Sequence, residues 1–306
     1  MPEQKLIFLI GLPHSGSTIF WRAFRKNPDF LCFDEPLTAS LGVHFPADNE
    51  KRTFGEYVRI FGNRPRDFWK IYRPILPIEE ASKHCDGAKI SYLKALCEYS
   101  RVTVIDETHL CMMVPEIARI HDNIYAIHLV RRASAFVTSH LLPSSKNKLA
   151  VPRAVIQKGR ERYNRSVFFD RRDFLTGMAR NEVIGSHPNS KFGLMLYDAG
   201  YDNERIMHSC TVIRLLAYWH YCYHATQGDG VRTFGNRFRM IQYENYAAAP
   251  EDTMAELYDW IGEAKPDKVN YNDVHPPRPP FLAQDKRWRE YAKIAGFTET
   301  EIDKLL

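Results

Sequence analysis

The chain has 306 residues, of which 44% are hydrophobic and 26% are charged. This composition excludes a disordered chain and a membrane-embedded one, and the length suffices to bury a core without disulfides or metal. The formal charge of +5 is concentrated between residues 143 and 180, where ten basic residues stand against three acidic ones and the net charge is +7. The remainder sums to −2, so the protein is near neutral with one basic stretch.

The six cysteines show neither the C-x-x-C spacing of a redox motif nor that of a zinc site. The apolar run Leu6 to Leu12 is too short for the core of a secretory signal or for a membrane span. We therefore expect a cytoplasmic protein with reduced cysteines, no membrane partner and an oligomeric state that the residues do not reveal.

Short apolar runs predict strands, and segments with one apolar face predict helices. In chain order, the expected elements are a strand at 5–12, a helix at 18–26, a strand at 30–33, helical pieces between 53 and 100, a strand at 102–105, a helix at 113–121, a strand at 125–130, helices at 133–142 and 206–227, a strand at 238–242, a helix at 251–261 closed by Gly262, and a helix that begins at Thr298 with a Thr298–Glu301 capping box.

The alternation of strands with helices predicts an α/β fold in which a parallel sheet is flanked by helices. We expect a single domain over residues 1–306. The basic segment at 143–205 breaks the alternation and is interpreted as an insertion, either a lid or an acceptor-binding wall.

Residues 11–18, Gly-Leu-Pro-His-Ser-Gly-Ser-Thr, join the first strand to the first helix. The glycines allow the backbone to fold around an anion, with the amides of residues 14–18 pointing at it from a helix N-terminus. The hydroxyls of Ser15, Ser17 and Thr18 add donors. The spacing is that of a Walker A loop, but Ser17 replaces the phosphate-binding lysine, which disfavours ATP or GTP hydrolysis.

This loop, with Gly16 at its centre, resembles the 5′-phosphosulfate loop of the sulfotransferases that use 3′-phosphoadenosine 5′-phosphosulfate (PAPS). Residues 125–132, Y-A-I-H-L-V-R-R, resemble the second signature of that family. There, a strand-end arginine and a serine eight residues later bind the 3′-phosphate, and Arg131 and Ser139 match this pattern. An arginine at the carboxyl end of a parallel strand lies at the ligand edge of the sheet, where its guanidinium can bind two phosphate oxygens.

Residues 106–110, D-E-T-H-L, resemble the K-T-H-L-P stretch of the cytosolic sulfotransferases, whose histidine is the general base. The resemblance implies that His109 takes the proton of the acceptor, a task that suits an imidazole near neutral pH. Glu107 and Cys111 depart from the pattern, since the family has Lys and Pro there. Glu35, in F-D-E-P-L, is the alternative base, because several subfamilies place a catalytic glutamate after the second strand.

His14 stands where the family has a Lys or Arg that bridges phosphate and sulfonate. Bound phosphosulfate would favour the imidazolium, which can stabilise charge on the leaving oxygen. The opposite reading is a PAPS-binding chain without catalysis. Residues 285–289 resemble a C-terminal basic element that closes over the nucleotide. Three nearby side chains are candidates for a second contact with the 3′-phosphate: Arg278, Lys286 and Arg287.

The resemblance implies a sulfotransferase fold with a P-loop-like sheet. The implied reaction is in-line transfer of the sulfonyl group from PAPS to a hydroxyl or amine of a small molecule, such as a secondary metabolite. It leaves adenosine 3′,5′-bisphosphate and needs no metal. The basic insertion could suit an anionic glycan or be a solvated face, and no nucleic-acid motif accompanies it. A P-loop nucleotide kinase and a non-catalytic nucleotide-binding protein are the alternatives. The missing lysine argues against the first, and the retained His109 and Glu35 argue against the second.

Overall fold

The computed structural model describes residues 3–45, 54–141, 168–170, 172, 183–185, 187–267, 269–277 and 279–306. The chain divides into two compact units, each built from two stretches of sequence. The first comprises Met1–Val130 and Cys222–Pro277, and the second comprises Arg131–Tyr221 and Arg278–Leu306. The expected insertion at 143–205 falls within the second unit, and residues 142–167 of the chain lie outside the described part. The single-domain organisation stays a prediction.

The first unit contains a five-stranded sheet in which every pairing is parallel and the order is β2-β3-β1-β4-β5. The inner strands are mainly apolar and are buried on both faces along nearly their whole length, as parallel strands covered by helices must be. The predicted parallel α/β sheet is therefore confirmed. The strands are β1 (Lys5–Gly11), β2 (Phe30–Asp34), β3 (Val102–Glu107), β4 (Ile124–Val130) and β5 (Phe238–Gln242).

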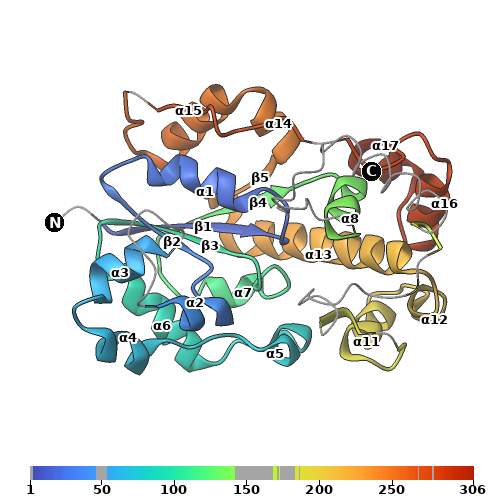
Figure 1. Cartoon of the computed structure of the whole chain (residues 1–306), viewed down its shortest axis with the longest axis horizontal. Helices are drawn as coiled ribbons and strands as arrows, with labels where there is room; N and C mark the ends of the chain where they lie inside the picture. Colours follow the sequence, from blue (N-terminus) through green and yellow to red (C-terminus); the bar gives the residue numbers. More distant parts are fainter. Residues whose placement is uncertain are drawn as a thin grey trace, which may run out of the picture. The chain divides into compact units, whose positions relative to one another are not determined.

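Helices cover both faces of this sheet. Helices α1, α14 and α15 lie on one side, and α3, α4 and α6 lie on the other (Figure 1). The helices of the first unit are α1 (Ser17–Arg25), α2 (Ala39–His44), α3 (Gly55–Phe61), α4 (Pro65–Ile71), α5 (Pro77–Ala81), α6 (Gly87–Cys97), α7 (Val114–Ile117), α14 (Tyr243–Ala248) and α15 (Pro250–Ile261), with a short 3-10 turn, η1, at Gly235–Arg237.

The core under α1, α14 and α15 is aromatic. Phe20 and Phe24 project from α1, and Phe20 meets Tyr246 of α14 edge-on at a centroid distance of 4.8 Å. Tyr258 of α15 stacks on Phe30 at the start of β2, at 5.6 Å. All four of the helix-borne rings are buried. These contacts fix the helix that follows the loop at residues 11–16, because each buried aromatic ring contributes both area and a preferred ring geometry.

Two helices differ from their predicted ranges. The helix expected at 113–121 ends after one turn as α7, and the chain continues through three-residue turns, such as Arg119 N–H to Glu116 O. The helix expected at 206–227 is split by residues 208–210. Its second part, α13 (Thr211–Phe234), continues past Gly228 and Gly230. At Gly230 the ring of Phe238 occupies the place of a side chain, with Cε2 2.1 Å from where a Cβ would stand.

The second unit is helical in its described part. Its helices are α8 (Ala133–Leu141), α11 (Lys191–Asp198), α12 (Asn203–Met207), the part of α13 up to Tyr221, α16 (Arg287–Ile294) and α17 (Glu299–Leu305).

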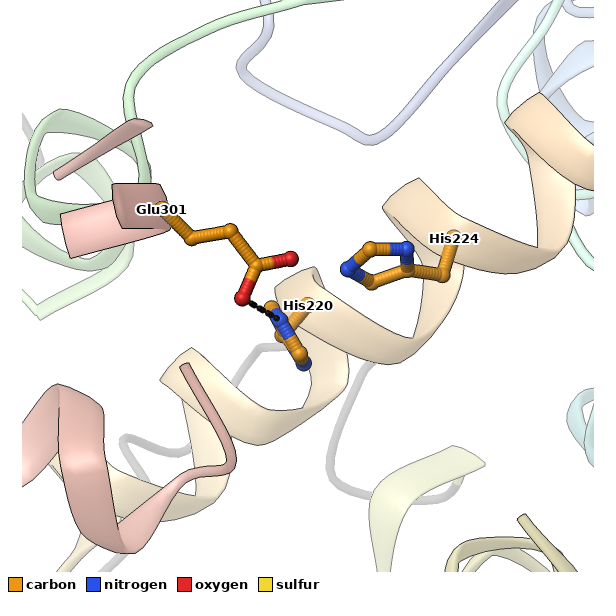
Figure 2. Close-up of side chains that lie close together, drawn as sticks. All are labelled: His220, His224 and Glu301. Carbon is orange, nitrogen blue, oxygen red and sulfur yellow. Dashed lines mark ion pairs between the residues drawn. The ribbon is translucent and has the colours of Figure 1, made fainter. Parts of the chain in front are cut away.

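The predicted capping box of the last helix is present, with Thr298 and Glu301 bonded to each other's backbone amides. The Glu301 carboxylate also lies 3.4 Å from His220 Nε2 (Figure 2). The other ring nitrogen of His220 forms a hydrogen bond with the Tyr201 hydroxyl at 2.8 Å. His224 lies one turn further along α13 (Figure 2). Although partial burial opposes it, hydrogen bonds from Thr298 and the neighbouring His220 lower the pKa of Glu301 to about 2.

The six cysteines are all buried, and none of them forms a disulfide, as the sequence predicts. Burial raises the pKa of the Cys97 thiol to about 12 and that of Cys85 to about 11. Among the helices that the structure describes, none combines the length and the apolar character that crossing a membrane requires.

Glu263, just after α15, ties this helix to the amino end of the sheet. Its carboxylate is 2.8 Å from Lys5 Nζ in β1 and 2.5 Å from Arg101 before β3. We expect Glu263→Gln to lower the free energy of unfolding by about 1–2 kcal/mol, since two charge-assisted bonds weaken and Arg101 is partly exposed. Urea unfolding measures this. The control Glu251→Gln, at the exposed start of α15, should change stability by under about 0.5 kcal/mol, and equal losses would contradict the prediction.

Candidate active site at the carboxyl end of the sheet

The strand order places the change of direction between β1 and β3, because the chain leaves β1 towards β2 and leaves β3 towards β4. In open parallel sheets, ligands bind outside the carboxyl ends of the strands at this switch point. Two segments singled out from the sequence start there, the loop after Gly11 and residues 108–110 after Glu107. Glu35 follows β2, the other neighbour of β3.

The loop after β1 ends in a helix N-terminus built to receive an anion. The Ser15 amide closes a turn on Leu12 O at 3.0 Å, and Gly16 then takes a left-handed conformation with φ 95°. The amides of residues 16–18 have no backbone acceptor within the described part of the chain. Such amides at a helix start carry the positive end of the helix dipole, which favours phosphate or sulfate.

Two further observations fit an anion at this loop. The Ser15 hydroxyl is buried and finds no hydrogen-bond partner among the described residues. His14 holds φ 66°, a left-handed conformation that non-glycine residues adopt at a cost. Hydroxyls and strained residues of this kind gather at ligand sites, so both fit the phosphate-binding role that the loop sequence predicts.

Gly16 is required by a close approach. The ring of Tyr243, which follows β5, lies where a side chain would stand, with its Cδ2 2.4 Å and its Cε2 2.5 Å from an added Cβ. The Tyr243 hydroxyl donates to His275 O at 3.1 Å, so the ring is held at both ends. The Tyr243 ring therefore constrains the backbone of the loop at Gly16.

His109 is held by a buried carboxylate. Glu107 Oε1 lies 2.6 Å from His109 Nδ1 and also accepts the His109 backbone N–H at 3.0 Å. Its Oε2 accepts the Leu37 backbone N–H at 2.8 Å. The Glu107 side chain is fully buried, whereas that of His109 is 18% exposed. The imidazole thus stands at the rim of the buried region with its orientation fixed from within.

Glu35 lies beside the same segment. Its backbone N–H donates to Asp106 O at 2.7 Å, and its Oε1 accepts the Thr108 hydroxyl at 2.9 Å. Its φ of 41° is left-handed, the second such non-glycine residue at this edge of the sheet. The structure therefore brings both candidate bases, Glu35 and His109, onto two adjoining segments at the ends of β2 and β3.

Asp34 and Asp106 form a buried carboxyl pair. They are register partners at the ends of β2 and β3, with exposed fractions of 3% and 0%. Burial, aided by the neighbouring charge of Glu35, raises the pKa of Asp34 to about 8. Burial and the proximity of Asp34 also raise the pKa of Asp106. At neutral pH Asp34 is therefore largely protonated, and the same effects favour the uncharged form of Asp106.

The predicted 3′-phosphate residues lie in the second unit. Arg131 directly follows β4, its carbonyl accepts the Trp219 indole N–H at 2.9 Å, and Ser139 on α8 donates to Phe136 O at 2.7 Å. Lys286 has an 87% exposed side chain. Arg287 pairs with Asp285 at 2.8 Å and lies over the Phe169 ring. Arg278 lies outside the described residues.

Sequence reasoning assigned no catalytic or binding role to Glu107, Thr108, Asp34, Asp106 and Tyr243. The signal for the three acids among them was the pairing of two strand ends, each with two acids in a row, D-E-P-L and D-E-T-H. Adjacent residues of a strand point to opposite faces, so Asp106 and Glu107 at the end of β3 lie on opposite faces of the sheet. Only the register of β2 against β3 shows which of these meet.

No protein-family profile matches the sequence, and no curated protein matches it. Solved structures that resemble this chain include the sulfotransferase domain of the Synechococcus PCC 7002 olefin synthase, with 14% identity, 99% of this chain and 93% of that chain covered, and a TM-score of 0.44. The sulfotransferase domain from the curacin biosynthetic pathway has 12% identity, 100% and 97% coverage, and a TM-score of 0.49. A sulfotransferase from Alicyclobacillus acidocaldarius has 12% identity, 98% and 96% coverage, and a TM-score of 0.43. All three are named sulfotransferases, the family that the sequence motifs resemble.

We expect Gly16→Ala to destabilise the protein by about 2 kcal/mol, because the new methyl group meets the Tyr243 ring in a backbone conformation that favours glycine. Thermal unfolding measures the change. Gly87→Ala is the matched control, since an added Cβ at the start of α6 meets nothing within 4 Å. A Gly16→Ala protein as stable as the control variant would show that the close approach to Tyr243 is not restrictive.

The raised pKa of Asp34 predicts a pH dependence of stability. The folded protein keeps a proton that the unfolded chain releases near pH 4, so this group stabilises fully below about pH 4 and its contribution is lost as the pH rises through about 8. The free energy of unfolding of the wild type, measured with urea, should therefore fall between pH 6 and pH 8.5. That of Asp34→Asn should fall less over the same range. Parallel slopes for the two proteins would contradict the assignment.

Proposed function

We propose that this protein is a PAPS-dependent sulfotransferase that transfers a sulfonyl group to a hydroxyl or amine of a small-molecule acceptor. The observation that carries the proposal is that two groups of the right chemistry lie at the same edge of the sheet. The loop of residues 11–18, called the anion loop below, follows β1 and lacks a Walker lysine, and the oriented imidazole of His109 follows the neighbouring strand β3. A donor anion and a base at adjoining strand ends are the two requirements of an in-line transfer.

In this proposal the 5′-phosphosulfate lies at the N-terminus of α1. The amides of residues 16–18 and the hydroxyls of Ser15, Ser17 and Thr18 bind its oxygens. The buried Ser15 hydroxyl thereby gains an acceptor, which it lacks among the described residues. His14 takes the position of the family's cation. Next to the phosphosulfate its imidazolium form is favoured, and it stabilises the negative charge that develops on the leaving phosphate oxygen.

His109 serves as the general base. Its ring takes the proton from the acceptor hydroxyl or amine while the acceptor atom forms a bond to sulfur. The bond between sulfur and the bridging phosphate oxygen breaks, and its electron pair leaves with adenosine 3′,5′-bisphosphate. Glu35 remains the alternative base, and its bond from Thr108 places it within the same group of side chains. The reaction needs positioning and charge stabilisation more than covalent chemistry from the protein.

The remaining assignments rest on the resemblance. Arg131 and Ser139 bind the 3′-phosphate, with Arg278, Lys286 or Arg287 as a second contact. Because Arg287 already pairs with Asp285, it must exchange that partner or share its guanidinium to do so. The acceptor is a small molecule such as a secondary metabolite. The lid or wall expected of the basic segment at 143–205 falls largely on residues outside the described part of the chain.

A titration followed by thermal unfolding tests the proposal, with adenosine 3′,5′-bisphosphate, AMP and ATP with Mg²⁺ in parallel. A ligand at one hundred times its Kd should add about 2.7 kcal/mol, a shift of a few degrees. We expect the bisphosphate to stabilise the protein more than AMP, because AMP lacks the 3′-phosphate. Arg131→Gln should remove that difference.

Arg132→Gln is the matched control, since this neighbouring arginine is exposed while Arg131 is half-buried. It should leave the bisphosphate shift unchanged. Stabilisation by ATP with Mg²⁺ and not by the bisphosphate would favour the kinase alternative. Stabilisation by none of the three nucleotides would overturn the proposal.

A further inference from the structure

Glu107 is a buried carboxylate whose hydrogen-bond partners among the described residues all belong to the candidate active site. It accepts from the backbone amides of Leu37 and His109 at 2.8 and 3.0 Å, and it lies 2.6 Å from His109 Nδ1. The family that the sequence resembles has lysine at this position, so its pattern assigns no such role to residue 107. A fully buried acid with three directed contacts requires a physical explanation.

We propose that Glu107 is the positioning residue of His109: it binds the Nδ1–H of the ring and thereby makes Nε2 the nitrogen that accepts the substrate proton. This inference rests on the proposed function for the identity of the substrate, and on the structure alone for the state of the ring.

In this proposal Glu107 is ionised, as its acceptance of two backbone N–H groups favours. An ionised carboxylate can only accept hydrogen bonds, so it acts as an acceptor towards the ring as well. A ring nitrogen that faces an acceptor must carry the proton, and a neutral imidazole has only one N–H. The neutral ring is therefore protonated at Nδ1, and Nε2 holds the lone pair that a general base needs.

Glu107 also acts on the charge that forms during the reaction. When Nε2 takes a proton, the ring becomes an imidazolium with its Nδ1–H directed at the carboxylate. A buried opposite charge at 2.6 Å stabilises that cation, because the surroundings screen the attraction weakly. A carboxylate that orients and stabilises a histidine in this way is the physical principle of catalytic triads.

The same carboxylate connects the two candidate bases. Its bond to the Leu37 amide holds the chain two residues after Glu35, while Glu35 itself binds the Asp106 carbonyl and the Thr108 hydroxyl. Three hydrogen bonds thus join residues 35–37 to residues 106–109. Because this joining fixes His109 relative to Glu35, the acceptor group meets a preorganised pair rather than two mobile side chains.

The experiment is NMR spectroscopy of the full chain with ¹⁵N-labelled histidine, in which long-range couplings report the protonation of each ring nitrogen. The His109 signals are assigned by their loss in His109→Gln. We expect wild-type His109 to titrate from a doubly protonated ring to the form with Nδ1 protonated. A neutral ring protonated at Nε2 would overturn the proposal without any variant of Glu107.

Glu107→Gln supplies the second measurement. We expect the titration of His109 to move to lower pH by about one unit or more, since the carboxylate no longer favours the cation. Glu56→Gln is the matched control: it removes another buried carboxylate, one that pairs with Arg25 on α1. It should lower stability without moving the His109 titration. An unchanged titration in a folded Glu107→Gln protein would overturn the proposal, and if this variant does not fold, the wild-type tautomer decides.

Turnover separates this inference from the proposed function. With PAPS and water as the acceptor, release of the bisphosphate by Glu107→Gln should fall by about 100-fold or more, with bisphosphate binding retained. The acid limb of the pH–rate profile should move with the NMR titration. A protein that does not bind the bisphosphate would refute the proposed function, whereas the ring state of His109 would still confirm or refute the role of Glu107.

Discussion

The pairing of β3 with β2 on one side and β1 on the other is the constraint on which the site depends. Parallel pairing brings three chain segments, distant in sequence, to a common edge with their polar ends in register. The anion loop, His109 and Glu35 each belong to a different one of these segments. The separations between the loop, His109 and Glu35 therefore depend on strand register, because a shift of one residue would exchange the two faces of the sheet.

The concentration of acids beside an anion loop raises an electrostatic question, which the protonation states answer. Four carboxyl groups end β2 and β3, yet a polyanion is proposed to bind next to them. Burial raises the pKa values of Asp34 and Asp106, which favours their uncharged forms. The Glu107 carboxyl group faces His109, with Oε1 2.6 Å from Nδ1. The negative potential at the loop is consequently smaller than the count of acids suggests.

Much of this architecture could be predicted from sequence. Apolar runs gave strands within one or two residues, Gly262 ends α15 in a left-handed conformation, and the Thr298–Glu301 capping box forms as expected. What could not be predicted depends on partners distant in sequence. Gly230 does not end α13, because Phe238 fills the space beside it. Similarly, Glu107 appeared only as a departure from a motif until β3 placed it against Leu37 and His109.

The contact of Tyr243 with Gly16 limits the order in which parts of the structure can form during synthesis. The loop is encoded within the first 18 residues, but the ring that supports it comes more than two hundred residues later, and its hydroxyl is anchored later still at His275. During synthesis, the emerging N-terminal part therefore carries the loop sequence without its aromatic support. The loop gains this support only when Tyr243, directly after β5, has joined the sheet, so any ligand binding by the loop requires a chain synthesised beyond that residue.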